Sequence, residues 1–139
     1  MSIRVVHALV VLGVAGLAAL AGPVAARADD DGDGDVRVEP RCTLRSTVEL
    51  RVRARDDDRL RVEVEVRTSR RGARWVVIVI HERRLVARLP VRTGPRSRSF
   101  SLRRTIADWP GRDTVVVRAI GPRGEICRAA VAVEEQASD

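Results

Sequence analysis

The chain has 139 residues, a formal net charge of +7 and an aromatic content of 2%. This length gives room for one domain and a targeting segment, and the scarcity of aromatic side chains argues against a surface that stacks on nucleic-acid bases. All 26 basic residues are arginine, and lysine, asparagine and tyrosine are absent. Because the codons of these three residues are AT-rich, the arginine bias indicates a high-GC genome, with selection for guanidinium chemistry as the alternative.

The first 28 residues have the three parts of a secretory signal peptide. Arg4 precedes an apolar run over 8–21, and Pro23 follows the run. Ala26 and Ala28 then supply the small residues of a cleavage site. We predict cleavage after Ala28, export of the chain and no membrane attachment of the mature protein. The alternative is an uncleaved segment that anchors the protein to the outer face of the membrane, although the run is short for a span of about 20 residues.

The segment 29–40 is rich in aspartate and is predicted to be a solvated, disordered tail. Asp29, Asp31 and Asp33, followed by Gly34, match the opening of a calcium-binding loop. These three carboxylates are therefore the candidate metal ligands. The match is partial, because such a loop closes with a glutamate at its twelfth position, which here is Pro40. We expect no cofactor.

Cys42 and Cys127 are the only cysteines of the chain. In the oxidising compartment that an exported protein meets, such a pair is expected to form a disulfide. The bond would close a loop of roughly 85 residues, for which the chain-entropy model gives on the order of 4.5 kcal/mol of stabilisation. A metal site and an intermolecular bridge are the alternatives. A metal site needs further ligands, and His81 is the only histidine after the signal peptide.

From residue 42 onward, apolar and polar side chains alternate, a pattern typical of strands with one solvated face. Such strands are predicted at 42–54 and 60–67, with the acidic turn Asp56-Asp57-Asp58 between them. Opposite charges in facing positions stabilise a hairpin, and like charges destabilise it. We therefore predict, with 56–60 as the loop, the register that pairs Arg53 with Glu63, Arg51 with Glu65, and Glu49 with Arg67.

The rest of the chain is also predicted to form strands, of which 75–80 is apolar on both faces, as expected of a central strand. Further strands are predicted at 75–80, 85–91, 97–105, 115–119 and 125–133, with turns at 93–95, 108–111 and 121–124. Pro90 indicates that its strand lies at a sheet edge. Seven short strands without helical periodicity after the signal-peptide helix are typical of an all-β, two-sheet antiparallel sandwich. This sandwich is predicted over 41–134, and a disordered C-terminal tail over 135–139.

The stretch from Trp109 to Ala119, with Pro110 and Gly111, resembles the Pro-Gly corner and sixth strand of fibronectin type III and related immunoglobulin-like domains. The resemblance implies an immunoglobulin-like sandwich. The chain departs from that family because it lacks the corner tyrosine, and from antibody domains because its cysteines lie in the first and last strands. It also looks like small secreted proteins of high-GC Gram-positive bacteria. A shared fold does not imply a function.

No combination of residues indicates catalysis. A hydrolase site needs a nucleophile, a base and an orienting group, and His81 is predicted at a hairpin turn. Glu49, Glu63 and Glu65 lie among arginines on solvated strand faces, a pattern that favours surface ion pairs over a dicarboxylate site. We therefore expect a protein that is not an enzyme.

Two groups of arginines are candidate contacts for an anion: Arg70, Arg71 and Arg74 beside one turn, and Arg103 and Arg104 on a strand. They favour at most a loose attraction to an anionic polymer such as a wall polymer. Specific nucleic-acid binding is not expected, because Trp75, Phe100 and Trp109 are predicted to be core residues. The preferred hypothesis is a secreted module that contacts a protein or a cell-envelope component; weak polyanion binding and enzyme inhibition are the alternatives. The sequence leaves the partner and the oligomeric state open.

Overall fold

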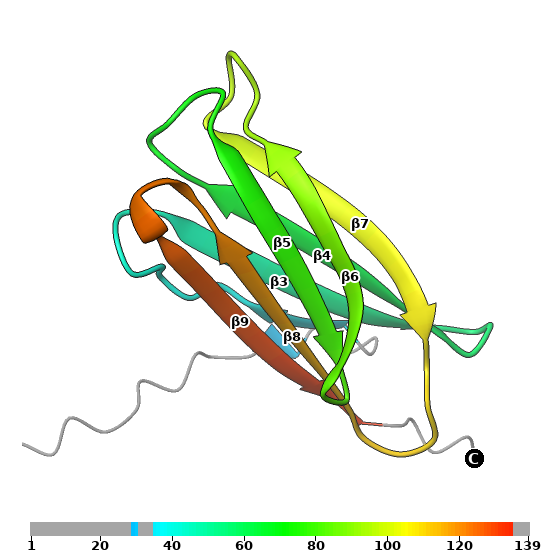
Figure 1. Ribbon diagram of the computed structural model, residues 1–139. Coiled ribbons are helices and arrows are strands. Elements are labelled where there is room, and N and C mark those ends of the chain that lie inside the picture. The colour runs from blue at the N-terminus through cyan, green and yellow to red at the C-terminus, as the bar shows by residue number, and fades with distance from the viewer. Residues whose placement is uncertain (1–28, 31–34, 135–139) are drawn as a thin grey trace, which may run out of the picture.

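Residues 29–30 and 35–134, which the computed structural model describes, form two antiparallel β-sheets packed face to face (Figure 1). The first sheet has the strand order β1-β2-β3-β4-β7, and the second has the order β6-β5-β8-β9. The strands are β1 Asp29–Asp30, β2 Asp35–Val38, β3 Thr47–Arg55, β4 Arg59–Arg67, β5 Arg74–His81, β6 Arg84–Arg92, β7 Ser99–Ala107, β8 Asp113–Ile120 and β9 Ile126–Val133, and a short 3₁₀ turn, η1 Pro122–Gly124, precedes β9. The predicted all-β sandwich is confirmed, and its arrangement is compatible with an immunoglobulin-like fold.

The predicted signal peptide, its cleavage residues Ala26 and Ala28, and the tail 135–139 lie outside the described residues. Within residues 29–30 and 35–134, no helix is long and apolar enough to cross a membrane. Strand β6, which carries Pro90, lies at the edge of its sheet as predicted.

The first sheet begins earlier in the chain than predicted. Residues 35–38 form strand β2, which pairs with β3, instead of belonging to a disordered tail. Val38 is buried opposite Leu50, and the Asp35 side chain is buried beside the guanidinium group of Arg53. The acidic composition of the segment concealed this strand, because its few apolar side chains alternate with charged ones whose partners lie on β3.

Strands β3 and β4 pair in a register that differs by two residues from the predicted one. Glu49 lies opposite Glu65, and Arg53 lies opposite Arg61. Arg55 also lies opposite Arg59. Like charges therefore face each other at three places in this hairpin, and the predicted register is wrong.

Two features of the structure explain the observed register. The connection is a three-residue turn, and its last residue, Asp58, has a φ of 52°, as in hairpins that close with a left-handed residue. In addition, β3 and β4 are interior strands, so their charges also have neighbours on β2 and β7. Arg37 on β2 binds Glu49, and Arg103 on β7 binds Glu63. A hairpin considered alone lacks these partners.

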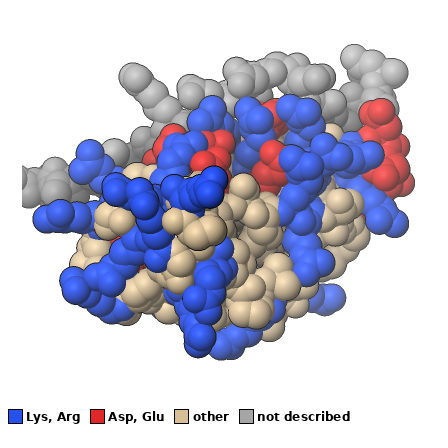
Figure 2. Space-filling view, turned by 90° about the horizontal axis from the view of Figure 1, so that it is seen from above, with Lys and Arg blue, Asp and Glu red and all other residues tan. Residues whose placement is uncertain are grey.

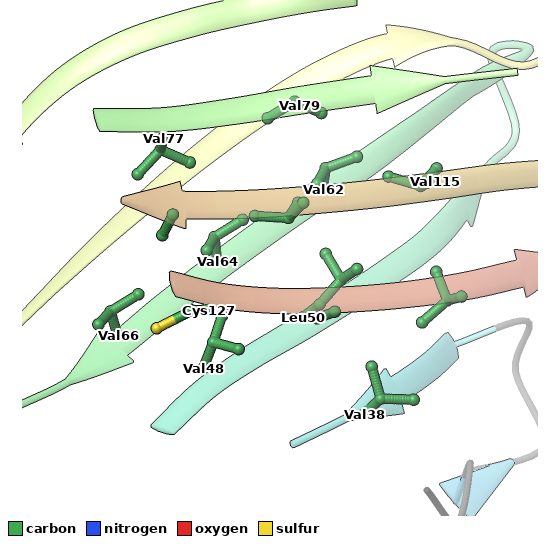
Figure 3. Close-up of a cluster of buried hydrophobic side chains, with 14 of the residues drawn as sticks. Val38, Val48, Leu50, Val62, Val64, Val66, Val77, Val79, Val115 and Cys127 are labelled. Atoms are coloured by element: carbon green, nitrogen blue, oxygen red, sulfur yellow. The ribbon is translucent and has the colours of Figure 1, made fainter. Parts of the chain in front are cut away.

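The core lies between the two sheets and consists mainly of valine side chains (Figure 3). Alternate residues of each strand point inward, among them Val62 and Val64 from β4 and Val77 and Val79 from β5, all at most 1% exposed. Each fully buried valine contributes about 1.5 kcal/mol or more. The alternating pattern therefore identified the inward face of β4 correctly, whereas β5 is apolar on both faces and only the structure shows which of its residues point inward.

The aromatic residues were only partly predicted. Trp75 and Phe100 are buried, with ring centroids 5.9 Å apart, which confirms their placement in the core. Trp109 is half-buried in the loop between β7 and β8. The prediction that Trp109 is a core residue is therefore wrong, because the corner that carries it lies at the end of the sandwich.

The predicted disulfide between Cys42 and Cys127 is present and closes a loop with a sequence separation of 85. Cys127 lies on β9, whereas Cys42 lies before β3 and not within a strand as predicted. The backbone N–H of Cys42 donates to the carbonyl of Ser46 at 2.9 Å. This turn breaks the strand pattern while keeping the sulfur directed into the core, where both cysteines are buried.

Gly121 offers a test of how tightly one end of the core is packed. A Cβ atom at this position would lie 2.5 Å from Cη2 and Cζ3 of the Trp75 ring, and the φ of −112° at Gly121 is open to any residue. Gly121→Ala is therefore expected to lower the free energy of unfolding by about 1–3 kcal/mol through overpacking, measured by urea denaturation. In a Trp75→Phe background the smaller ring leaves space for the methyl group, so the same substitution should cost less; an equal cost in both backgrounds would show that the clash is not with Trp75.

Candidate functional site

The outer face of the first sheet carries charges of both signs that neutralise each other. We call it the ion-paired face. Arg37 lies 2.9 Å from Glu49, Arg103 lies 2.8 Å from Glu63, and Asp35 accepts from Arg53 at 2.8 Å. Its remaining ion pairs link Arg37 to Glu39, Arg51 to Asp35, and Arg67 to Glu39, Glu49 and Glu65. The hydrogen bond to Glu65, followed by the charge of that carboxylate, raises the pKa of Arg67. The predicted surface ion pairs thus exist, and every carboxylate of Asp35, Glu49, Glu63 and Glu65 on this face has an arginine partner.

The outer face of the second sheet has a different composition. We call it the arginine–aliphatic face. Its side chains alternate with buried ones such as Trp75, Val77 and Val117, and they are aliphatic or basic. The aliphatic members are Val76, Ile78, Ile80, Val116, Ile120 and Ile126, and the basic members are Arg74, Arg88, Arg92, Arg118 and Arg128. In the four strands of this sheet the only acidic residue is Asp113, which is buried.

Three of these arginines form a row across the sheet. Arg118 lies directly opposite Arg128, and Ile78 separates Arg118 from Arg88. Like charges in facing positions destabilise a sheet. Within the described part of the chain, none of the three makes an ion pair. On the ion-paired face, strand β2 supplies opposite charges to facing like charges, with Arg37 beside Glu49 and Asp35 beside Arg53. The row of Arg88, Arg118 and Arg128 has no such partners among the described residues.

A shallow hollow lies at the end of this face where β5 begins and β6 ends. Its volume is about 460 Å³, and its lining consists of Arg74, Trp75, Val76, Pro90, Val91, Arg92 and Ile120. Arg74 and Arg92 face each other across β5 and β6. One guanidinium nitrogen of Arg92 donates to the carbonyl of Gly72 at 3.2 Å. A guanidinium group has five N–H donors, so this bond uses only one of them. The hollow therefore combines an aliphatic floor with two cationic side chains.

Figure 2, which views the molecule from this end, shows the same asymmetry. Acidic side chains gather toward the upper part of the view, and the lower part shows basic and uncharged side chains. The apolar area also continues toward the opposite end of the sheet, where Leu85 is 64% exposed and Val86 is 41% exposed. Exposed apolar side chains beside half-buried aliphatic ones make this face the candidate interaction site.

The structure separates the arginines that the sequence proposed as anion contacts. Arg74 lines the hollow, and Arg70 and Arg71 are exposed in the loop that leads into it. Arg103 instead lies on the ion-paired face, where Glu63 neutralises it. Arg104 is exposed on the edge strand β7, opposite Val62. The five residues therefore do not form one site.

Sequence reasoning missed the arginines of the second sheet. Arg88, Arg92, Arg118 and Arg128 were not among the arginines proposed as contacts. The available signal was that the predicted strands containing them lack acids on the solvated positions, unlike the strands at 42–54 and 60–67. Strand order was also needed to show that these arginines share one face.

A second group of chemically active side chains lies at the opposite end of the sandwich. His81 is 1% exposed, and its Nε2 forms a hydrogen bond with the carboxylate of Asp113, which is 2% exposed. The other carboxylate oxygen of Asp113 accepts from the backbone N–H of Trp109 at 3.3 Å. The indole of Trp109 stacks on the imidazole with centroids 4.4 Å apart, and the Arg84 guanidinium lies 5.4 Å from the indole centroid.

This arrangement is a buried structural pair and offers no hydrolytic site. The sequence placed His81 at a turn, but its side chain points inward because it occupies the buried parity of β5. Within residues 29–30 and 35–134, its only side-chain hydrogen-bond partner is Asp113. A base without an adjacent nucleophile and without access to solvent cannot carry out acyl transfer.

The candidate metal ligands do not gain support from the structure. Asp31 and Asp33 lie outside the described residues, and Asp29 belongs to the short strand β1. Among the residues that are described, no three histidine, cysteine or acidic side chains are grouped so that they could hold a metal ion.

Comparison of the chain with protein-family models, with curated proteins and with solved structures gives no significant match. What is established is the two-sheet antiparallel sandwich with its disulfide. Because a sandwich of this kind serves many unrelated functions, the function must be argued from the chemistry of the face and not from the fold.

Proposed function

We propose that this chain is an exported, non-enzymatic binding module that contacts a protein or a cell-envelope component through the arginine–aliphatic face. The observation that carries the proposal is the pairing of Arg118 with Arg128 on a face that has no carboxylate.

The disulfide supports export, because such bonds persist in oxidising compartments. The order of β3 to β9 and the Pro-Gly corner at Pro110 and Gly111, where Gly111 has a φ of 93°, support a fibronectin type III-like assignment.

If a partner covered the arginine–aliphatic face, both its aliphatic and its arginine side chains would contribute to the binding free energy. The half-buried aliphatic side chains gain about 25 cal/mol for every Å² of apolar surface removed from water. Arginine is enriched at protein interfaces because its planar fork binds carboxylates through two parallel hydrogen bonds. A partner with carboxylates would also relieve the repulsion between Arg118 and Arg128. The ion-paired face offers less, since its carboxylates already have arginine partners and it lacks the aliphatic side chains.

Binding of an anionic polymer is the second candidate. It is favoured by the exposed loop arginines Arg70 and Arg71, which lie beside the hollow. A polyanion, however, would bind only the arginines and would gain nothing from the aliphatic side chains of the face. Its binding would depend on total charge and would fall steeply with salt.

The double substitution Arg118→Glu with Arg128→Glu tests the proposal. Capture of the partner from envelope extracts by the immobilised protein is expected to fall at least about tenfold, since truncating or reversing buried interface charges commonly costs 2 kcal/mol or more. The matched control is Arg55→Glu with Arg59→Glu, which reverses two arginines that also face each other, but on the first sheet near its hairpin turn. It changes the net charge equally. Equal loss of capture in both variants would contradict the assignment of the face and would favour the polymer.

A further inference from the structure

The hollow belongs to a longer aliphatic strip that crosses the second sheet. Pro90 faces Val76, Val76 faces Ile120, and Ile120 faces Ile126. These residues lie side by side on β6, β5, β8 and β9, so the strip is about 14 Å long at the usual spacing of neighbouring strands. Along the strand direction the strip is one residue wide, so an extended segment that runs parallel to the strands would cross it and reach the residues on both sides.

Arginines border the strip on both long sides. Arg92 and Arg74 lie two residues from Pro90 and Val76 on one side. On the other side, two residues away in the opposite direction along their strands, lie Arg88, Arg118 and Arg128. Residues two apart in a strand point to the same face and are separated by about 6.6 Å. A group seated on the strip would thus have guanidinium groups within reach on either side.

We infer that the strip binds a short extended segment of a partner protein in which aliphatic side chains are flanked by acidic ones. The inference rests on the proposed function and specifies its ligand. The segment would run parallel to the strands, so that its aliphatic centre lies on Val76 and Ile120. The acidic residues before and after that centre would then bind the arginines on the two sides through paired hydrogen bonds.

Other occupants fit the strip less well. A sugar polymer or a nucleic acid would be expected to use exposed aromatic rings for stacking, and Trp75, the one ring in the lining, is 1% exposed. A membrane surface favours tryptophan and tyrosine at its interface, and the face presents neither. A polyphosphate would bind the arginines but not the strip. The mixed composition therefore favours an acidic and aliphatic peptide.

The test uses a blocked, fluorescently labelled peptide of sequence Glu-Glu-Leu-Val-Leu-Glu-Glu and measures its binding to the disulfide-bonded protein by anisotropy at physiological ionic strength. An analogue with glutamine in place of each glutamate removes the charge at constant shape. An analogue with serine in place of the three central residues removes the apolar part. We expect each analogue to bind at least about tenfold more weakly than the parent, because each lacks one of two required components. Equal binding of the parent and either analogue would overturn the inference.

Variants of the protein locate the site. Arg74→Gln with Arg92→Gln is expected to weaken binding of the parent peptide but not of its glutamine analogue, and Arg55→Gln with Arg59→Gln should leave both unchanged. Polyphosphate or phosphatidylglycerol vesicles that bind more tightly than the peptide, or a dimer that the Arg74 and Arg92 substitutions dissolve, would replace the proposed occupant and overturn the inference. If no peptide binds while capture from extracts still depends on Arg118 and Arg128, the inference fails and the proposed function stands.

Discussion

Replacing both Cys42 and Cys127 by alanine is expected to lower the free energy of unfolding by about 4 kcal/mol, because the bond closes a long loop in the unfolded chain. The two sulfurs connect the segment before β3 to β9, with a sequence separation of 85. This bond therefore cross-links the start of the sandwich to its last strand. A domain of this size has a total stability of about 5–15 kcal/mol, so the loss would remove a large share of it. Urea denaturation followed by tryptophan fluorescence measures the effect.

The control for this substitution is the unaltered protein in a reducing agent, which should unfold at the same urea concentration as the alanine variant. Mass spectrometry of protein recovered from the culture medium, before and after reduction, would test the export proposal in the same material. The expected species begins at Asp29 and gains two hydrogens on reduction. Full-length protein found inside the cell with both thiols free to react with an alkylating agent would contradict export. A variant as stable as the unaltered protein would show that the disulfide contributes little.

The fold could be predicted because its main determinant is local. Alternation of apolar and polar residues fixes which face of a strand is buried, as in the strand that contains Val62. A run that is apolar on both faces, as around Val77, marks an interior strand instead. The order of these strands in the sheets was not predicted, because pairing between distant segments leaves no comparable mark in a single sequence. The same limitation applies to strand β2, whose place in the first sheet depends on acceptors and side chains supplied by β3.

Charge patterns proved less informative than apolar ones, for a physical reason. A surface ion pair contributes at most about 1 kcal/mol and can form diagonally or with a third strand. The pair of Glu49 with Arg37, which lies on β2, is such a case. The prediction of the hairpin register weighed only the two strands of the hairpin and therefore chose the wrong partners. Apolar packing leaves less freedom, since a shift of one residue would expose the core face.

The candidate site could not be predicted from the sequence, because its distinguishing feature is that one sheet face has arginines but no acidic residues. Arg88, Arg118 and Arg128 lie on three different strands, and only the strand order places them in one row. Their chemical meaning comes from the absence of acids on that face, which cannot be judged before the face is known. The abundance of arginine throughout the chain, interpreted as a mark of base composition, further concealed the few whose position is unusual.

The pair formed by His81 and Asp113 gives the second large effect. His81→Ala is expected to lower the free energy of unfolding by about 3 kcal/mol, because it leaves a buried carboxylate without its partner and opens a cavity beside Trp109. Both side chains are at most 2% exposed, so water cannot readily replace the lost hydrogen bond. Urea denaturation of the single variants measures these costs. The substitution Asp113→Ala should be similarly harmful, since it also removes the acceptor of the Trp109 backbone N–H.

The double variant His81→Ala with Asp113→Ala separates the pair interaction from the loss of packing. If the two groups stabilise the fold mainly through each other, the cost of the double variant should be smaller than the sum of the single costs by at least about 1 kcal/mol. Additive costs would mean that each residue acts through its own packing and that the hydrogen bond contributes little.

Peptide binding at the strip provides an internal check. The pair lies near the ends of β5 and β8 that are remote from the hollow, so a variant that still folds should bind the peptide as the unaltered protein does. Loss of binding in a folded variant would show that the two ends of the sandwich are coupled.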